Sequence, residues 1–252
     1  MSDVSPQAPR GSAEMSAAPG GGWSRLLTWC VAGIVVEILL TLLVFAFIPP
    51  LLVFAVLFVA AALWLRRSPR PASIALIVLL VLYLVMNIPF RLPTLAVPAS
   101  VGDFVTSALV AVLGVTGLVA AVALLRRRGE GGTGGPRRAG AIALGLLGIA
   151  VVVSVAARVS YEEAEARPGD IELAAEDFEF TNESLQTDAG RVSVTVTNED
   201  QTWHTFTIES LDVDLDIPAA TTARVTFDAE PGTYEFFCRP HPEDMKGELQ
   251  VR

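Results

Sequence analysis

Five long apolar stretches constrain this chain more than any other feature of its sequence. Together they contain a single charged residue, Glu37. A helix needs about 20 apolar residues to cross the hydrocarbon core of a bilayer, with a usual range of ~17–25. A wholly soluble enzyme is therefore excluded, and we expect five transmembrane helices, at 26–48, 49–65, 72–90, 104–125 and 139–157.

The second stretch, 49–65, is the least certain span. It is short and begins with the pair Pro49-Pro50. It forms either a tight helical hairpin with the first stretch or a re-entrant segment that does not cross. In the second case the N-terminus changes side, but the part of the chain after the fifth stretch does not.

Charge divides the chain into two different parts. Residues 1–158 carry a net charge of +7 and residues 159–252 carry −16. An acidic surface repels the phosphates of nucleic acids, so we exclude nucleic acid as a partner.

Arginines between the apolar stretches predict the orientation, because positive loops stay in the cytoplasm. Ten arginines lie on one side if all five stretches span: Arg10, Arg25, Arg66, Arg67, Arg70, Arg126, Arg127, Arg128, Arg137 and Arg138. Only Arg91 and Arg158 lie on the other side. We expect a multi-pass protein with its N-terminus in the cytoplasm and its C-terminal domain extracytoplasmic. Abundant Arg, Ala and Gly beside a single Lys favour the plasma membrane of a bacterium.

Composition also predicts the segments around the helices. Small and polar residues dominate the N-terminus. Glycines and arginines dominate the segment between the fourth and fifth stretches, and acidic residues dominate the segment after the fifth stretch. We expect a disordered cytoplasmic tail at 1–22, a four-helix transmembrane region at 23–125, a cytoplasmic linker at 126–138, a fifth transmembrane helix at 139–158 and a stalk at 159–169.

From Asp170 onward the hydrophobic period changes to that of a β-domain. Apolar and polar residues alternate strictly in 191–197 and 223–228. Turn residues separate further short strand candidates at 171–174, 177–180, 204–208, 213–217, 233–238 and 247–251. This spacing is typical of an antiparallel sandwich or barrel, which we expect at 170–252.

Cysteine, histidine and methionine gather at the end of this domain. Cys238, His241 and Met245 follow one another with the spacing C-x2-H-x3-M, and the only other histidine, His204, lies on a predicted strand. Two His, one Cys and a weak axial Met describe a mononuclear blue-copper site for electron transfer. Soft sulfur donors stabilise Cu(I), and imidazole accepts both oxidation states. Copper sites that need three or more histidines are excluded.

Two other interpretations of these residues stay open. Zn(II) also binds Cys and two His, although a structural zinc site favours four firm ligands. Cys238 could instead be a free buried thiol, but a lone thiol outside the cytoplasm is liable to oxidation.

The stretch from Val192 to Val251 resembles the cupredoxins, the plastocyanin and azurin type of type 1 copper protein. The pieces that match are Asn198, His204-Thr205-Phe206, Pro231-Gly232-Thr233-Tyr234-Glu235-Phe236-Phe237-Cys238, His241 and Met245-Lys246-Gly247-Glu248-Leu249. The resemblance implies a Greek-key cupredoxin β-sandwich that holds one copper ion. It also implies that His204, Cys238 and His241 are equatorial ligands and that Met245 is axial. Thr205 stands where several relatives have Asn.

Three functions are consistent with these features. The first is a membrane-anchored type 1 copper protein that carries single electrons on the extracytoplasmic face, with a redox partner such as a cytochrome or a respiratory complex. The alternative is an extracytoplasmic copper-binding protein for copper delivery or sensing. The third is a scaffold or transporter that the copper domain regulates. We find no catalytic motif and expect an electron carrier rather than an enzyme.

Glu37 is a second candidate functional residue. An ionisable group in the middle of a membrane helix is costly and commonly serves a function. Alternatively, Glu37 is protonated and bonds to a neighbour, for which Asn87 in the third stretch is the candidate.

Overall fold

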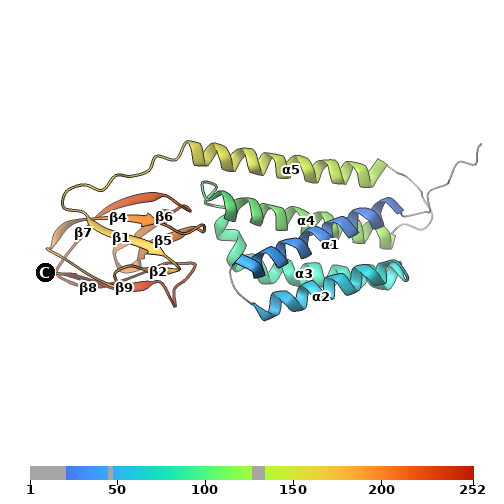
Figure 1. The fold of residues 1–252 in the computed structure, drawn as a ribbon, viewed down its shortest axis with the longest axis horizontal. Coiled ribbons are helices and arrows are strands. Elements are labelled where there is room, and N and C mark those ends of the chain that lie inside the picture. The colour runs from blue at the N-terminus through green and yellow to red at the C-terminus, as the bar shows by residue number, and fades with distance from the viewer. Residues whose placement is uncertain (1–20, 45–47, 127–133) are drawn as a thin grey trace, which may run out of the picture.

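The computed structural model describes residues 21–44, 48–126 and 134–252. Figure 1 shows helices lying side by side, with a β-sheet domain beyond one end of them. Most of the tail expected at 1–22 and half of the linker expected at 126–138 lie outside the described residues.

The helical part is a bundle built around one central helix. Its elements are α1 (Gly21–Val44), α2 (Pro49–Leu65), α3 (Pro69–Thr94), α4 (Val101–Arg126) and α5 (Gly134–Val159). The central helix α4 packs against α1, α3 and α5, while α2 packs against α1 and α3. Side chains that face the centre, such as Leu27, Ile34 and Leu80, are fully buried, and many outward side chains are apolar and exposed. An extended apolar surface of this kind suits contact with lipid.

Four helices, α1, α3, α4 and α5, are long and apolar enough to cross a membrane. The remaining helix, α2, has 17 residues. At a rise of ~1.5 Å per residue it is about 26 Å long, which is less than the ~30 Å thickness of a typical hydrocarbon core. The prediction of five spans is therefore not confirmed, and a crossing by α2 stays a prediction.

Helix α3 is longer than the apolar stretch that predicted it. It continues beyond residue 90 through Pro93 to Thr94. Arg91 forms an ion pair with Glu37 of α1, so its charge is compensated inside the bundle. Arg91 therefore lies in a helix and not in a loop.

The β-domain contains two sheets. The first has the order β2-β1-β4-β7, with β1 (Ile171–Glu176), β2 (Glu179–Phe180), β4 (Gly190–Asn198) and β7 (Thr222–Ala229). The second has the order β3-β9-β8-β5-β6, with β3 (Ser184–Thr187), β5 (His204–Ile208), β6 (Val213–Ile217), β8 (Gly232–Phe237) and β9 (Lys246–Val251). A short 3-10 turn, η1 (Glu209–Leu211), joins β5 to β6.

The prediction of an antiparallel sandwich or barrel is wrong for two of the strand pairs. Strand β1 runs parallel to β4, with Ile171 opposite Val194, and β3 runs parallel to β9, with Ser184 opposite Glu248. The other strand pairs are antiparallel. Successive side chains point to opposite faces of a sheet in parallel and in antiparallel pairs alike. The alternation of apolar residues therefore does not distinguish parallel from antiparallel pairing. The Greek-key connection stays a prediction.

Strand β3 has no counterpart among the sequence predictions. Only Leu185 of its four residues is buried, so the strand carries almost no hydrophobic pattern. It forms because β9 offers it a free edge.

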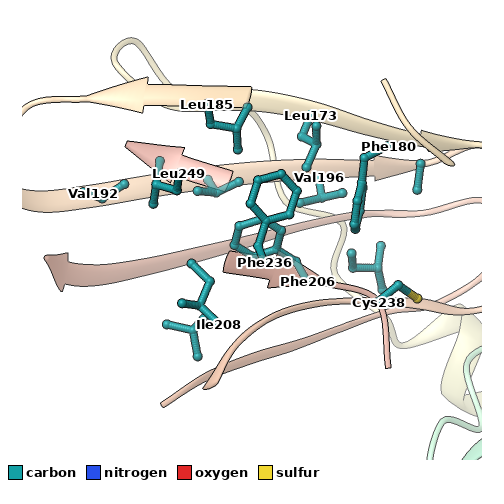
Figure 2. Close-up of a cluster of buried hydrophobic side chains, with 14 of the residues drawn as sticks. Leu173, Phe180, Leu185, Val192, Val196, Phe206, Ile208, Phe236, Cys238 and Leu249 are labelled. Atoms are coloured by element: carbon teal, nitrogen blue, oxygen red, sulfur yellow. The ribbon is translucent and has the colours of Figure 1, made fainter. Parts of the chain in front are cut away.

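Apolar side chains from both sheets meet in one core. Figure 2 shows Leu173 and Val196 of the first sheet near Phe206 and Phe236 of the second. The ring of Phe236 lies 5.2 Å from Phe206 and 5.4 Å from Phe180, measured between centroids. Cys238 lies at one end of this cluster, and its sulfur points away from the aromatic rings (Figure 2). The aromatic core thus supports the place where the chemistry gathers.

Candidate metal centre

The four predicted ligands come from neighbouring strands of the second sheet. His204 is the first residue of β5, and Cys238 directly follows β8. His241 and Met245 lie in the loop between β8 and β9. Because β8 pairs with both β5 and β9, these residues reach the same end of the sheet.

Three ligand atoms converge at this end. The Sγ atom of Cys238 lies 3.6 Å from Nδ1 of His204 and 3.7 Å from Nδ1 of His241. The three side chains place one ligand atom each within 4.8 Å of one another. His204 and Cys238 are buried and His241 is half-buried. The structure therefore brings together the three residues that the resemblance to the cupredoxins implies as equatorial ligands.

The loop that carries His241 and Met245 is closed by its own backbone. The amide of His241 donates to the carbonyl of Cys238 at 3.0 Å, and the amide of Met245 donates to the carbonyl of His241 at 2.9 Å. The amide of Cys238 donates back to the carbonyl of Met245 at 2.8 Å. The Met245 side chain is fully buried beside this loop. Its role as an axial ligand stays a prediction.

A carboxylate fixes the ring of His204. Nε2 of His204 lies 2.8 Å from Oδ2 of Asp200. A carboxylate at this nitrogen holds the proton there and leaves the lone pair on Nδ1. Nδ1 is the atom that faces the Cys238 sulfur, so the pairing presents His204 as a ligand.

A strained turn holds this carboxylate in place. Asp177 and Phe178 link β1 to β2 with positive φ angles of 53° and 64°, a conformation that is rare for a bulky side chain. Both amides donate to Asp200, at 2.9 and 3.1 Å. The Phe178 ring packs edge-on against His241 and His204, with centroids 4.9 and 5.8 Å apart. The turn thus supports the carboxylate and both imidazoles at once.

This turn also corrects the strand predicted at 177–180. Only Glu179 and Phe180 belong to β2. The pairing of Glu176 with Glu179 leaves a two-residue hairpin loop. Positive φ at both of its residues is the conformation of a type I′ turn.

The Cys238 sulfur accepts a backbone hydrogen bond. The Thr205 amide lies 3.4 Å from Sγ, and the Thr205 hydroxyl accepts the Arg239 amide at 2.8 Å. Burial raises the pKa of the Cys238 thiol, while the bond from Thr205 opposes that shift. The thiol therefore keeps its proton until a metal ion displaces it.

Both imidazoles are neutral at pH 7. Burial lowers the pKa of His204, against the opposing effect of Asp200. Burial is the main cause that lowers the pKa of His241 to about 4, and the neighbouring His204 acts in the same direction. Neutral imidazole is the form that binds a metal ion.

The chemistry of this donor set fits copper. One soft sulfur and two imidazoles face each other in a nearly dry position, as a type 1 copper site requires. Three such donors leave a structural zinc site one firm ligand short of four.

Two residues of the centre, Asp200 and Phe178, were not predicted from the sequence as site residues. Asp200 stands four residues before His204 in a turn, where an acid is unremarkable. Phe178 falls in a segment with an apparent strand pattern. Their roles come from contacts between distant segments, and no local signal in the sequence distinguishes them.

Glu37, the other candidate, lies far from this centre in the sequence and in the fold. Its carboxylate is buried and accepts hydrogen bonds from Thr41 at 3.1 Å and Tyr83 at 3.0 Å, and it pairs with Arg91. The prediction of Asn87 as its partner is wrong, because the Asn87 side chain donates to the carbonyl of Tyr83 at 2.8 Å. One helical turn separates Asn87 from Arg91, and the longer arginine reaches the carboxylate instead.

Comparison with known proteins identifies the C-terminal part of the chain. Residues 145–251 match the family model of the cupredoxin-like domain. This confirms the resemblance drawn from the sequence, and the match begins inside α5. No curated protein matches the chain.

Solved structures of amicyanin resemble part of the chain. A reduced tryptophan-to-tyrosine mutant of amicyanin is 21% identical, with 35% of this chain and 87% of that chain covered and a TM-score of 0.31. The Cu(I) form of a methionine-to-alanine mutant is 23% identical, with 36% and 90% covered and a TM-score of 0.31. Amicyanin from Paracoccus versutus is 18% identical, with 35% and 86% covered and a TM-score of 0.30.

Proposed function

We propose that this chain, whose residues 145–251 form a cupredoxin-like domain, is a membrane-anchored type 1 copper protein that carries single electrons on the extracytoplasmic face. One observation carries the proposal: the Cys238 sulfur faces Nδ1 of His204 and of His241 at 3.6 and 3.7 Å. A thiolate with two imidazoles is the donor set of blue-copper electron carriers.

In this proposal His204, Cys238 and His241 hold the ion, and Met245 completes the set. A copper ion bound there would supply a one-electron couple between Cu(II) and Cu(I). The protein contributes rigidity, because the Asp200 carboxylate, the Thr205 amide and the closed loop after Cys238 fix the ligands. Ligands that cannot move keep the rearrangement between the two oxidation states small.

His241 is the ligand through which a partner exchanges electrons. It is half-buried, whereas His204, Cys238 and Met245 are buried. We expect a redox partner such as a cytochrome or a respiratory complex to approach this edge.

The membrane assignment rests on the helices and on the loop charges. Four helices are apolar and long enough to span. If α2 crosses as well, ten arginines fall on the side opposite to the β-domain. We therefore place the protein in the plasma membrane of a bacterium with residues 159–252 outside the cytoplasm.

Absorption and electron paramagnetic resonance spectra of the copper-loaded full chain in detergent test the copper site. We expect an intense visible band from a Cu–thiolate bond and narrow copper hyperfine splitting. Cys238→Ser removes both features. Cys30→Ser is the matched control, since it removes the other cysteine, which is buried in α1, and leaves the spectra unchanged.

A pale protein with wide splitting would contradict the copper–thiolate assignment. A blue protein that exchanges its copper with a chelator faster than it exchanges electrons would instead favour copper delivery. Met245→Leu tests the axial position separately: it changes the hyperfine splitting and the reduction potential if the thioether is a ligand.

Protease treatment tests the orientation. In intact spheroplasts protease removes residues 159–252, whereas in inverted membrane vesicles these residues are protected. The reverse pattern would place the β-domain in the cytoplasm and contradict the proposal.

A further inference from the structure

The β-domain touches the helices through the first turn of α4. The Asp103 carboxylate accepts a hydrogen bond from the Trp203 amide at 2.8 Å. It also accepts the Thr202 hydroxyl, which lies 3.1 Å from each carboxylate oxygen. The Ser100 hydroxyl donates to the same carboxylate at 2.8 Å. One membrane-helix carboxylate therefore binds the two residues that directly precede the ligand His204.

A second set of contacts holds the same end of the β-domain. The amide of Ala219 donates to the Ser100 hydroxyl oxygen at 3.4 Å, and Arg158 at the end of α5 donates to the carbonyl of Ala220 at 3.1 Å. The Ser154 hydroxyl of α5 donates to the carbonyl of Pro98 at 2.7 Å. In Figure 1 this end of the domain lies next to the start of α4. Two loops of the β-domain are thus held by α4, α5 and the loop between α3 and α4.

This contact buries polar groups. Ser100 is fully buried, and Trp203 is only 4% exposed. A buried amide needs a hydrogen-bond acceptor, and for Trp203 that acceptor belongs to α4. The segment before His204 is therefore completed by the helical part of the chain.

Asp103 also lies close enough for its charge to act on the metal centre. Its carboxylate bonds to the Trp203 amide at 2.8 Å, and Trp203 directly precedes the ligand His204. A negative charge near a metal ion favours the more positive oxidation state. Asp103 therefore acts on the segment of His204 through hydrogen bonds and on the centre through its charge.

We propose that Asp103 is a positioning residue of the metal centre, and that the β-domain works while docked by this end on its own helices. The effect on copper rests on the proposed function, whereas the docking does not. The segment after α5 is thus a connection between two parts in contact: its Ala164 amide donates to the Thr222 carbonyl of β7 at 3.0 Å. In this proposal the segment is not a flexible linker that lets the β-domain move independently of the helices.

The experiment compares Asp103→Asn, Asp103→Ala and Asp228→Asn in the full chain in detergent. Asn keeps an oxygen that accepts the Trp203 amide but removes the charge, while Ala removes both. Asp228 is exposed at the far end of β7 and has the same charge, so its variant controls for the loss of one acid.

The first measurement is amide hydrogen exchange of the copper-free protein. Asp103→Ala raises the exchange rate of the Trp203 amide at least tenfold, Asp103→Asn raises it less, and the control leaves it unchanged. Should Asp103→Ala fail to fold, Asp103→Asn decides the docking, because the Trp203 amide bonds less strongly to a neutral amide oxygen than to a carboxylate. Equal exchange of the Trp203 amide in the parent and in the folded variants would overturn the docking.

The second measurement is the reduction potential of the copper-loaded protein. Both Asp103 variants shift the equilibrium toward Cu(I) by roughly tenfold, which is about 59 mV for one electron, and the control does not. A change in exchange with an unchanged potential would overturn the effect of Asp103 on the centre. A parent protein without a copper–thiolate band would overturn the proposed function, and the exchange rates would still decide the docking.

Discussion

Replacing Asp200 with Asn tests how much the carboxylate behind His204 contributes to metal binding. The carboxylate accepts three N–H groups. Nε2 of His204 at 2.8 Å and the Phe178 amide at 3.1 Å bond to Oδ2, and the Asp177 amide at 2.9 Å bonds to Oδ1. An amide has one oxygen and one NH2 group. At least one of the three donors therefore faces another donor in Asp200→Asn.

The expected magnitude follows from this arrangement. If the amide oxygen takes the place of Oδ2, His204 keeps an acceptor but loses a charged one. Hydrogen bonds to a charged group are roughly twice as strong as neutral ones. Loss of such a partner of a ligating histidine typically weakens metal binding by ~10–100-fold, or about 1.4–2.8 kcal/mol.

Competition for copper between the full chain in detergent and a chelator of known affinity measures this effect. The Asp200→Asn protein loses half of its copper at a chelator concentration ~10–100-fold lower than the parent protein does. Asp228→Asn, an exposed change of the same kind, binds as the parent does. Equal affinity of the parent and Asp200→Asn, within about twofold, would refute the argument that this carboxylate prepares His204 as a ligand.

Three further predictions concern stability. Glu37→Gln leaves Arg91 without its charged partner inside the bundle, and removal of one member of a buried pair costs ~3–5 kcal/mol. Calorimetry in detergent therefore detects a lower unfolding temperature of the helices. An unchanged unfolding temperature would contradict the role of the pair. Gly247→Ala places a Cβ 2.5 Å from a neighbouring backbone oxygen, which costs ~1–3 kcal/mol. Gly232→Ala, whose nearest neighbour would lie 3.5 Å away, leaves the unfolding of the β-domain unchanged. Hydrogen bonds from the Arg224 guanidinium hold the pKa of Asp170 below its usual 3.8. The carboxylate therefore contributes stability that is present above pH 3.8 and is lost as the pH falls further. Denaturant titrations at several pH values measure this dependence, and Asp170→Asn removes it.

The convergence of His204, Cys238 and His241 was predictable because its signal is local and rare. Cys238, His241 and Met245 stand within eight consecutive residues, and His204 is the only histidine left in the chain. The chain offers few other histidines or cysteines that could lie beside the Cys238 sulfur. The spacing of these residues and their small number were therefore enough to predict which of them converge. The apolar helices were predictable for a similar reason, since hydropathy is a property of each segment alone.

The length of α3 and the partner of Glu37 were not predictable in the same way. Hydropathy ends the third stretch before Arg91, because a charged residue counts against a span. In the fold the charge of Arg91 is paired with Glu37 from another helix, and the helix continues through it. The pairing depends on how α1 and α3 pack, which neither segment specifies on its own.

Local patterns in the sequence were enough to predict that apolar helices precede a β-domain and which three side chains face one another there. Only the packing of distant segments shows that β1 and β3 pair in parallel. The same is true of the support that Asp200 and Phe178 give the imidazoles, and of the hold of Asp103 in α4 on the residues before His204. Asp103 and Trp203 are a hundred residues apart. A contact of that kind exists only after both parts have folded and one surface has met the other.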